Sequence, residues 1–341
     1  MYNRTNVLIT GAGGHLAHFI FRAIQHSKLN TTIIGCNYDH DAVGLYQMDK
    51  GYVVPPAKSD NYIDKLIDIC LKEKIHIIFA GGMIELRVLS KHKKEIFEKT
   101  GAKVISSDFD IIRNVEDKCV LPELLIKSGM PAPNTVLASD TSNMQQFLDV
   151  NEFPLMVKDR FGSGSQGIAK VNNLTDLQQQ VKEINNPIIQ EYLQPDDEEY
   201  TVGVYVTQDH QPVGSIVMKR TLGLGMTMKA EVVIDNEISD FCESAVATLG
   251  LVGPNNVQLR KTEKGPMIFE INPRLSSTTS ARPLFGYNDI EMSIREYVYN
   301  EKLSKPIIKS GYFYRVIEDI VVQKTKIDTT EKNKYIDNTR P

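Results

Sequence analysis

The chain has 341 residues, of which 41% are hydrophobic and 24% are charged, with a formal net charge of -4. A chain of this length can bury substantial cores, and the length predicts two or three closely joined folding units. Since no surplus of basic residues indicates a nucleic-acid partner, small molecules are the expected ligands.

The four cysteines are far apart and form no C-x-x-C pair, which argues against a zinc ribbon and against a redox dithiol. The N-terminal segment has no apolar signal core, and no apolar run approaches the ~20 residues that a membrane span needs. We therefore expect a cytoplasmic protein with no membrane partner, and a homodimer stays open.

The first third of the sequence alternates short apolar strands with amphipathic helices. Strands are expected at residues 6–10, 31–36, 76–82 and 101–107, and helices from Leu16 through Ile24 and at 62–74. Strand, helix and strand at this spacing predict right-handed crossovers and a parallel, Rossmann-like α/β sheet.

A glycine-rich turn follows the first strand in "NVLITGAGGHLAHF". Between a strand and a helix, such a turn can place backbone N–H groups on an anion. Thr10, Gly11 and Gly14 come close to the motif of nicotinamide-dependent reductases, and Asp39 follows the second strand, where a ribose-binding acid would lie. An NAD(P)-dependent oxidoreductase or epimerase is therefore one interpretation, and a turn needed only for packing is another.

The composition changes after the helical pattern that ends before Pro131 and Pro133, and we place a domain junction near Ser106. From there, hairpin-like strands with glycine-rich interruptions predict a shift from α/β to α+β. The final segment, residues 324–341, is polar, and we expect it to be loosely held.

The segment "NNVQLRKTEKGPMIFEINPRLSSTTS" reads as two strands joined by a turn. Gln258, Glu270 and Asn272 present oxygen ligands that suit a hard cation such as Mg²⁺, which takes its remaining ligands from water and phosphates. Arg274 falls on the same strand face and could neutralise a phosphoryl group in transfer. The alternative is a solvated hairpin with a charged edge.

A second segment, "VKDRFGSGSQGI", places Lys158 at a strand end before a glycine-rich loop. Glycines let backbone N–H groups approach phosphate oxygens closely. No G-K-[ST] closes the loop, so it is not a Walker loop, and a flexible surface loop is the alternative.

A third segment, "IIQEYLQPDDEEYTVGV", ends an apolar strand with backbone groups that could bind adenine, at Gln190, Glu191, Tyr192 and Leu193. Glu199 follows at a position suited to ribose hydroxyls, although the loop leaves the register of Glu198 against Glu199 open. A charged hairpin loop is the alternative here. Upstream, "EDK" contains Lys118, which would be an ordinary solvated lysine in most proteins.

Together, and in this order, these segments resemble the ATP-grasp superfamily, most closely its carbamoyl phosphate synthetase large-subunit-like branch. The resemblance covers almost the whole chain. It implies a Rossmann-like preATP-grasp domain at residues 1–105, an ATP-grasp domain at 106–305 and a C-terminal extension at 306–341. Within the grasp domain it implies two α+β subdomains that clasp ATP: 106–187, with Lys118 and the glycine-rich loop, and 188–305, with the hinge and the metal site.

The resemblance also implies roles for the matching residues. Lys118 and Lys158 would hold the nucleotide phosphates, with Arg274 and Lys158 in catalysis. Gln258 replaces an acidic metal ligand found in many members, so the site has one fewer negative charge. The remaining implied residues are the loop residues Gly162, Ser163 and Gly164, the adenine hinge Gln190, Glu191, Tyr192 and Leu193, the ribose contact Glu199, and the metal ligands Gln258, Glu270 and Asn272.

The activity implied is a carboxylate-amine (or thiol) ligase that uses ATP and Mg²⁺, with Mn²⁺ as an alternative metal. A substrate carboxylate would attack Mg·ATP to give an acyl phosphate, and a nucleophile would then displace phosphate. Expected acceptor contacts are Gly13, Gly14, Arg220, Lys229 and Arg282. The alternatives are the oxidoreductase above and a non-catalytic nucleotide-binding protein with the grasp fold.

Overall fold

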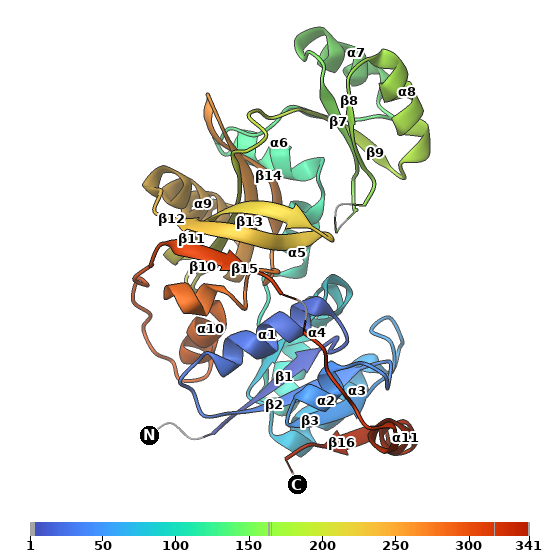
Figure 1. Cartoon of the computed structure of the whole chain (residues 1–341), viewed down its shortest axis with the longest axis vertical. Helices are drawn as coiled ribbons and strands as arrows, with labels where there is room; N and C mark the ends of the chain where they lie inside the picture. Colours follow the sequence, from blue (N-terminus) through green and yellow to red (C-terminus); the bar gives the residue numbers. More distant parts are fainter. Residues whose placement is uncertain (1–3, 163, 165, 317, 340–341) are drawn as a thin grey trace.

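The computed structural model describes residues 4–162, 164, 166–316 and 318–339. Its strands form two six-stranded sheets and one four-stranded sheet. Figure 1 shows them in succession along the long axis, with the sheet of the first third at one end and the four-stranded sheet at the other. The predicted combination of α/β and α+β architecture is confirmed. Within the described residues, no helix is both long enough and apolar enough to cross a membrane.

The first sheet has the strand order β16-β3-β2-β1-β4-β5, and β1 to β5 pair in parallel. Val7, Leu8 and Ile9 of its central strand are fully buried, because helices cover both faces of a parallel sheet. Its strands are β1 (Thr5–Thr10), β2 (Thr31–Asn37), β3 (Lys50–Val53), β4 (Ile77–Phe79) and β5 (Lys103–Val104). Its helices are α1 (His15–Gln25), α2 (Gly44–Gln47), α3 (Tyr62–Glu73) and α4 (Met83–Thr100).

The expectation of a loosely held C-terminal segment is wrong for the residues that the structure describes there. They form α11 (Lys324–Asn333) and β16 (Tyr335–Asp337), and β16 pairs antiparallel with β3 at the edge of the first sheet. The Tyr335 ring lies 4.7 Å from the Tyr52 ring, and the Lys72 ammonium lies over both. Backbone pairing and this aromatic contact hold a segment whose composition is polar.

The second sheet is antiparallel, with the order β14-β13-β10-β11-β12-β15. Helices α5, α6 and α9 supply apolar side chains to a core with β10 and β13. Its strands are β10 (Glu199–Val206), β11 (Pro212–Gly223), β12 (Met226–Val233), β13 (Gly253–Thr262), β14 (Gly265–Asn272) and β15 (Gly311–Tyr314). The associated helices are α5 (Phe109–Glu116), α6 (Val120–Lys127), α9 (Asn236–Thr248), the 3-10 turn η1 (Arg282–Phe285) and α10 (Asp289–Tyr297).

The third sheet has the order β6-β9-β7-β8 and forms a small lobe with its own core (Figure 1). Its elements are β6 (Thr135–Leu137), α7 (Thr141–Val150), β7 (Leu155–Asp159), β8 (Ile168–Val171), α8 (Leu174–Glu183) and β9 (Pro187–Glu191). Residues 192–198, between β9 and β10, connect this lobe to the second sheet.

Candidate active site

A cavity of about 430 Å³, here called the central cavity, lies between the four-stranded sheet and the second six-stranded sheet. Many residues that the sequence singles out from separate segments line it together. They are Lys118, Lys158, Gly162, Gly164, Gln190, Glu191, Tyr192, Leu193, Glu199, Arg220, Gln258 and Glu270. Ser163 is outside the described residues.

Lys158 is the last residue but one of β7, and it lines the central cavity. Nζ donates a hydrogen bond of 2.6 Å to Oε1 of Gln190 and lies 5.0 Å from the centre of the Phe269 ring. Burial lowers the pKa of Lys158 to about 8, although the Glu270 carboxylate opposes the change. A phosphate group would restore the charged form of this lysine, because it would replace the lost water with anionic oxygens.

Lys118 is held at the cavity by an ion pair on the preceding residue. Arg160 donates to both carboxylate oxygens of Asp117, at 2.8 and 2.7 Å, and Asp117 also accepts from the backbone N–H of Cys119. Burial alone would raise the pKa of Asp117, but Arg160 and the backbone donors outweigh it and hold that pKa below its usual value. Nζ of Lys118 donates to the carbonyl of Gly162, so the lysine and the glycine-rich loop lie in contact.

The glycine-rich loop reaches the turn between β11 and β12. A Cβ on Gly225 would lie 2.9 Å from the carbonyl oxygen of Gly164, which is closer than real Cβ contacts allow. Gly164 and Gly225 both have positive φ angles, of +66° and +71°, and both line the central cavity. Glycine is therefore required at Gly225 for a close approach that closes one side of the cavity.

Glu199, and not Glu198, faces the central cavity. Its carboxylate accepts from Arg220 at 2.7 Å and from Arg260 at 2.9 Å. Burial would raise the pKa of Glu199, but the guanidinium groups, Arg220 first, hold it below its usual value. Glu198 instead bonds Lys219 and Tyr200.

The hinge between the two sheets is braced by Arg260. Nη1 of Arg260 donates to the backbone carbonyl of Leu193, and the guanidinium lies 5.5 Å from the Tyr192 ring. Sequence reasoning missed Arg260, although its place two residues after Gln258 on one strand puts it on the same face.

The predicted metal ligands lie side by side. Gln258 and Glu270 are directly opposite in the β13–β14 register, and Nδ2 of Asn272 donates to Glu270 at 2.8 Å. In the described part of the chain, no group of three or more His, Cys, Asp or Glu side chains could hold a metal ion. One carboxylate with amide oxygens nonetheless fits Mg²⁺, which keeps several waters and takes phosphate ligands. Oε1 of Gln258 also accepts from Arg220 at 2.7 Å.

Arg274 lines a second cavity of about 420 Å³, which shares Lys118, Gly162 and Glu270 with the central cavity. Its guanidinium donates to the carbonyl of Leu275 at 2.8 Å and to Oδ1 of Asn272 at 3.1 Å. Burial lowers the pKa of Arg274, and the side chain is held beside the metal-ligand strand. Because the two cavities meet at Glu270, Arg274 lies in the second cavity beside this junction.

The second cavity extends to the first sheet. Its lining includes Gly81 and Gly82, before α4, and His15 at the start of α1. A Cβ on Gly81 would lie 2.0 Å from the carbonyl oxygen of Thr10, so only glycine permits this approach between the ends of β1 and β4. Gly13 and Gly14 line a third cavity of about 580 Å³ that also includes His15.

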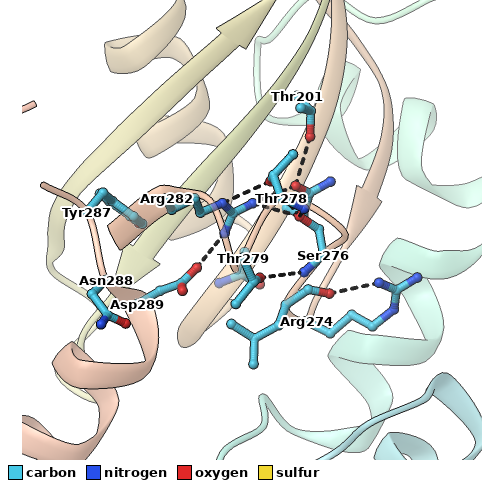
Figure 2. Close-up of polar contacts among 12 residues, drawn as sticks. Thr201, Arg274, Ser276, Thr278, Thr279, Arg282, Tyr287, Asn288 and Asp289 are labelled. Atoms are coloured by element: carbon cyan, nitrogen blue, oxygen red, sulfur yellow. Dashed lines mark hydrogen bonds and ion pairs between the residues drawn. The ribbon is translucent and has the colours of Figure 1, made fainter. Parts of the chain in front are cut away.

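Three predicted acceptor contacts lie elsewhere. Arg220 is in the central cavity, paired with Glu199. Lys229 is exposed on β12 with its ammonium 5.5 Å from the Tyr314 ring. Arg282 is 0% exposed and bonds Thr278, Asn256, Ser276 and Asp289, as Figure 2 shows in part. The structure does not bring these three cations together.

Comparison with known proteins decides the family. Residues 115–278 match the model of the ATP-grasp domain, and residues 7–105 match that of the PylC-like N-terminal domain. The chain belongs to the ATP-grasp superfamily. Its similarity to the carbamoyl phosphate synthase large chain is distant: 21% identity over 315 residues with that of Pyrococcus furiosus, covering 83% of this chain and 29% of the relative. With the large chain of Thermoplasma volcanium it is 23% over 345 residues, covering 90% and 32%.

Solved structures show the same ATP-grasp fold. The N5-carboxyaminoimidazole synthetase of Staphylococcus aureus complexed with ADP has a TM-score of 0.73 at 16% identity, covering 96% of this chain and 85% of that one. The biotin carboxylase domain of Hydrogenobacter thermophilus 2-oxoglutarate carboxylase, in complex with MgADP and bicarbonate, has a TM-score of 0.67 at 16% identity, covering 90% and 73%. The predicted cofactors, ATP and Mg²⁺, agree with these bound nucleotides and metal.

The chain spans less than a third of each of these curated relatives: 23% of the large chain of Sulfolobus acidocaldarius and 32% of that of Thermoplasma volcanium. At these identities the solved structures establish the fold and leave the substrate to be argued from the cavities themselves.

Proposed function

We propose that this chain is an ATP-dependent ligase that joins a substrate carboxylate to a nucleophile, an amine or a thiol, through an acyl phosphate. The observation that carries the proposal is the junction of the central and second cavities at Lys118, Gly162 and Glu270. A nucleotide in the central cavity and an acceptor in the second cavity would meet at this junction, beside the predicted metal ligands and Arg274.

In the first step a carboxylate oxygen of the acceptor attacks the γ-phosphorus of ATP. The bond from that phosphorus to the bridging oxygen breaks, and ADP leaves with the electron pair. Lys118 and Lys158 bind the phosphates on the central-cavity side, and Arg274 meets the transferring group from the second cavity. The protein's contribution is positioning and charge neutralisation, which suits a reaction that needs little covalent help.

Glu270, Asn272 and Gln258 would hold Mg²⁺, which supplies charge neutralisation at the phosphate oxygens when it is bound. Arg220 is bonded to Gln258 and Glu199 together, so it fixes the amide of one predicted metal ligand and the carboxylate proposed for the ribose. The chain thereby couples the nucleotide position to the metal position.

In the second step the nucleophile attacks the acyl carbon, the carbon–oxygen bond to phosphate breaks, and the nucleophile loses a proton. Glu116 lies in the second cavity, where it accepts from Arg87 at 2.8 Å. Burial raises the pKa of Glu116, although Arg87 and Arg274 oppose the change. A carboxylate with a raised pKa is a better base, so we assign Glu116 to take the proton from an attacking amine.

The test is incubation of the full chain with Mg·ATP and a panel of carboxylates and amines, with ADP and new product masses followed together. A coupled mass that appears with ADP supports the proposal. Glu270→Gln, which removes the only carboxylate of the metal set, should abolish both signals, while Lys264→Gln, on an exposed turn, serves as the matched control. Selective thermal stabilisation by NAD without any response to Mg·ATP would overturn the proposal in favour of the dinucleotide interpretation.

A further inference from the structure

The third cavity lies along α1, on the far side of His15 from the second cavity. It is about 580 Å³ in volume and is lined by residues of α1, the turn between β11 and β12, the loop before η1 and the segment after β15. Figure 1 shows the segment after β15 running past α1 toward α11. His15 lines both cavities, so the second and third cavities adjoin at this residue.

One face of α1 forms a wall of this cavity. His15, His18, Phe19, Arg22 and His26 all line it. Their spacing of three, four, seven and eleven residues from the first places them along a single helical stripe. The stripe combines an aromatic side chain with one arginine and three histidines. In the described part of the chain, Arg22 forms no ion pair.

The opposite wall is mainly apolar. Leu224, Met226 and Met228 come from the β11–β12 region, and Leu284 comes from η1. Leu224 is 79% exposed and Leu284 is 60% exposed. Neighbouring apolar side chains left open to water at a cavity rim are typical of a binding site, because a ligand that covers them gains their transfer free energy.

The Arg315 side chain is held in a fixed position at the third cavity. Nε donates to the carbonyl of Thr227 at 3.0 Å, and Nη2 donates to the carbonyl of Ser277. The guanidinium lies 4.2 Å from the centre of the Phe19 ring and 5.7 Å from that of Phe313. These contacts fix its position, while Nη1 makes no hydrogen bond to any described residue.

The charges around the cavity favour an anion. The described lining residues include two arginines, Arg22 and Arg315, and a single carboxylate, that of Glu318, and three histidines add ring nitrogens. A fixed guanidinium with a spare Nη1 edge matches the geometry of a carboxylate or phosphate oxygen.

We infer that the third cavity binds a part of the acceptor that has an apolar body and an acidic group. The acidic group lies at Arg315, and the apolar body lies against the leucine and methionine side chains of the opposite wall, Leu224, Met226, Met228 and Leu284. The acceptor is therefore an amphipathic acid, and its reactive carboxylate lies in the second cavity near Arg274. The inference rests on the proposed function for the identity of the occupant as a substrate. The binding chemistry of the cavity can be measured without turnover.

The experiment titrates the full chain, saturated with Mg·ADP, with three probes followed by ligand-observed NMR: 3-phenylpropanoate, its neutral amide 3-phenylpropanamide, and propanoate. We expect 3-phenylpropanoate to bind at least about tenfold more tightly than either of the other two probes, because the amide lacks the negative charge and propanoate lacks the aromatic ring. Equal binding of the acid and the amide would overturn the assignment of an acidic group, and equal binding of the two acids would overturn that of an apolar body.

Variants locate the site. Arg315→Gln should weaken 3-phenylpropanoate about tenfold and leave the amide unchanged, since only the acid uses the charge-assisted bond. Leu224→Asn should weaken both aromatic probes, and it provides a second variant if Arg315→Gln does not fold. Leu224 has a φ of +52° that asparagine tolerates, and its exposed side chain makes a folding defect unexpected. The control is Arg113→Gln, because the Arg113 side chain is exposed on α5.

The two failures are distinguishable. Wild-type affinity of Leu224→Asn and of folded Arg315→Gln for 3-phenylpropanoate would overturn the third-cavity assignment, while Mg·ATP-dependent ligation could still be observed. Binding of 3-phenylpropanoate that depends on Arg315 would support the cavity chemistry even if the ligase assay failed.

Discussion

Arg282 and Asp289 form an ion pair that the protein encloses completely, with side-chain exposures of 0% and 1%. The remaining donors of Arg282 reach Oγ1 of Thr278 and, through Nη2, Oδ1 of Asn256 at 2.8 Å and Oγ of Ser276 at 2.9 Å (Figure 2). One side chain thus ties β13, the start of α10 and the loop that follows Arg274. Arg282 therefore holds the conformation of this loop and does not line the central, second or third cavity.

We expect Arg282→Ala to lower the free energy of unfolding by about 3–5 kcal/mol, because the change leaves the Asp289 carboxylate buried without its partner. Urea unfolding followed by circular dichroism measures the loss. Arg295→Ala is the matched control: Arg295 is 34% exposed and bonds Glu291 at 2.8 Å, and its loss should cost less than about 1 kcal/mol. A stable Arg282→Ala protein with a raised acceptor KM would instead favour the substrate contact that the sequence suggested.

Lys158 should make nucleotide binding dependent on pH. Its pKa is about 8 in the free protein because burial disfavours the ammonium, and bound phosphate raises that pKa. Binding therefore takes up a proton above pH 8, so the affinity for Mg·ATP should be constant below that pH and fall by at most about tenfold per pH unit above it. Titration calorimetry across this range measures the fall.

Lys158→Arg provides the control for this pH dependence, because a guanidinium stays protonated throughout the range. Its affinity for Mg·ATP should be weaker but flat with pH. A slope above pH 8 that persists in Lys158→Arg would show that another group titrates.

Gly225→Ala should weaken Mg·ATP binding by displacing the glycine-rich loop. The added Cβ would lie 2.9 Å from the carbonyl oxygen of Gly164. Gly129→Ala is a matched control, since Gly129 has a similar positive φ of +75° and open space around its Cβ position. Both changes should cost about 1 kcal/mol of stability through backbone strain. Only Gly225→Ala should raise the dissociation constant of Mg·ATP, and equal constants for the two variants would exclude a role for this contact.

Much of the fold follows from local patterns in the sequence. Short continuous apolar runs such as residues 7–9 belong to parallel strands buried on both faces, and their alternation with amphipathic helical patterns predicts them. The pairing of β16 with β3 was missed because it depends on an open sheet edge and on the Tyr52–Tyr335 contact, which joins residues far apart in the chain. Local composition contains no signal of either.

In the candidate site too, local sequence patterns predict some features, and others depend on residues that are distant in the sequence. Glu270 and Asn272 lie two residues apart on one strand, so strand periodicity is enough to place them on one face. The β13–β14 register, which the sequence does not give, brings Gln258 opposite Glu270. From the sequence, Arg282 and Arg220 are equivalent, as cations expected at one acceptor site. They differ in the ion pairs that they form in the folded structure. Arg282 pairs with Asp289, and Arg220 pairs with Glu199 in the central cavity. Arg315 was missed because its role depends on Phe19, which is distant in sequence.

The final prediction concerns Arg274, at the boundary of the central and second cavities. If it neutralises the phosphoryl group in transfer, Arg274→Ala should lower kcat about 10²- to 10³-fold and leave the KM for ATP nearly unchanged, because the lost contact forms in the transition state. Arg113→Ala controls for the removal of a positive charge, because the Arg113 side chain is exposed on α5. Arg274 also bonds the Leu275 carbonyl and Asn272, so melting temperature must be measured with the rate. Arg274→Lys keeps the charge and loses the fork of donors, and it should recover part of kcat. A folded Arg274→Ala protein with unchanged kcat would remove this residue from the chemistry and leave the metal ligands and lysines to carry it.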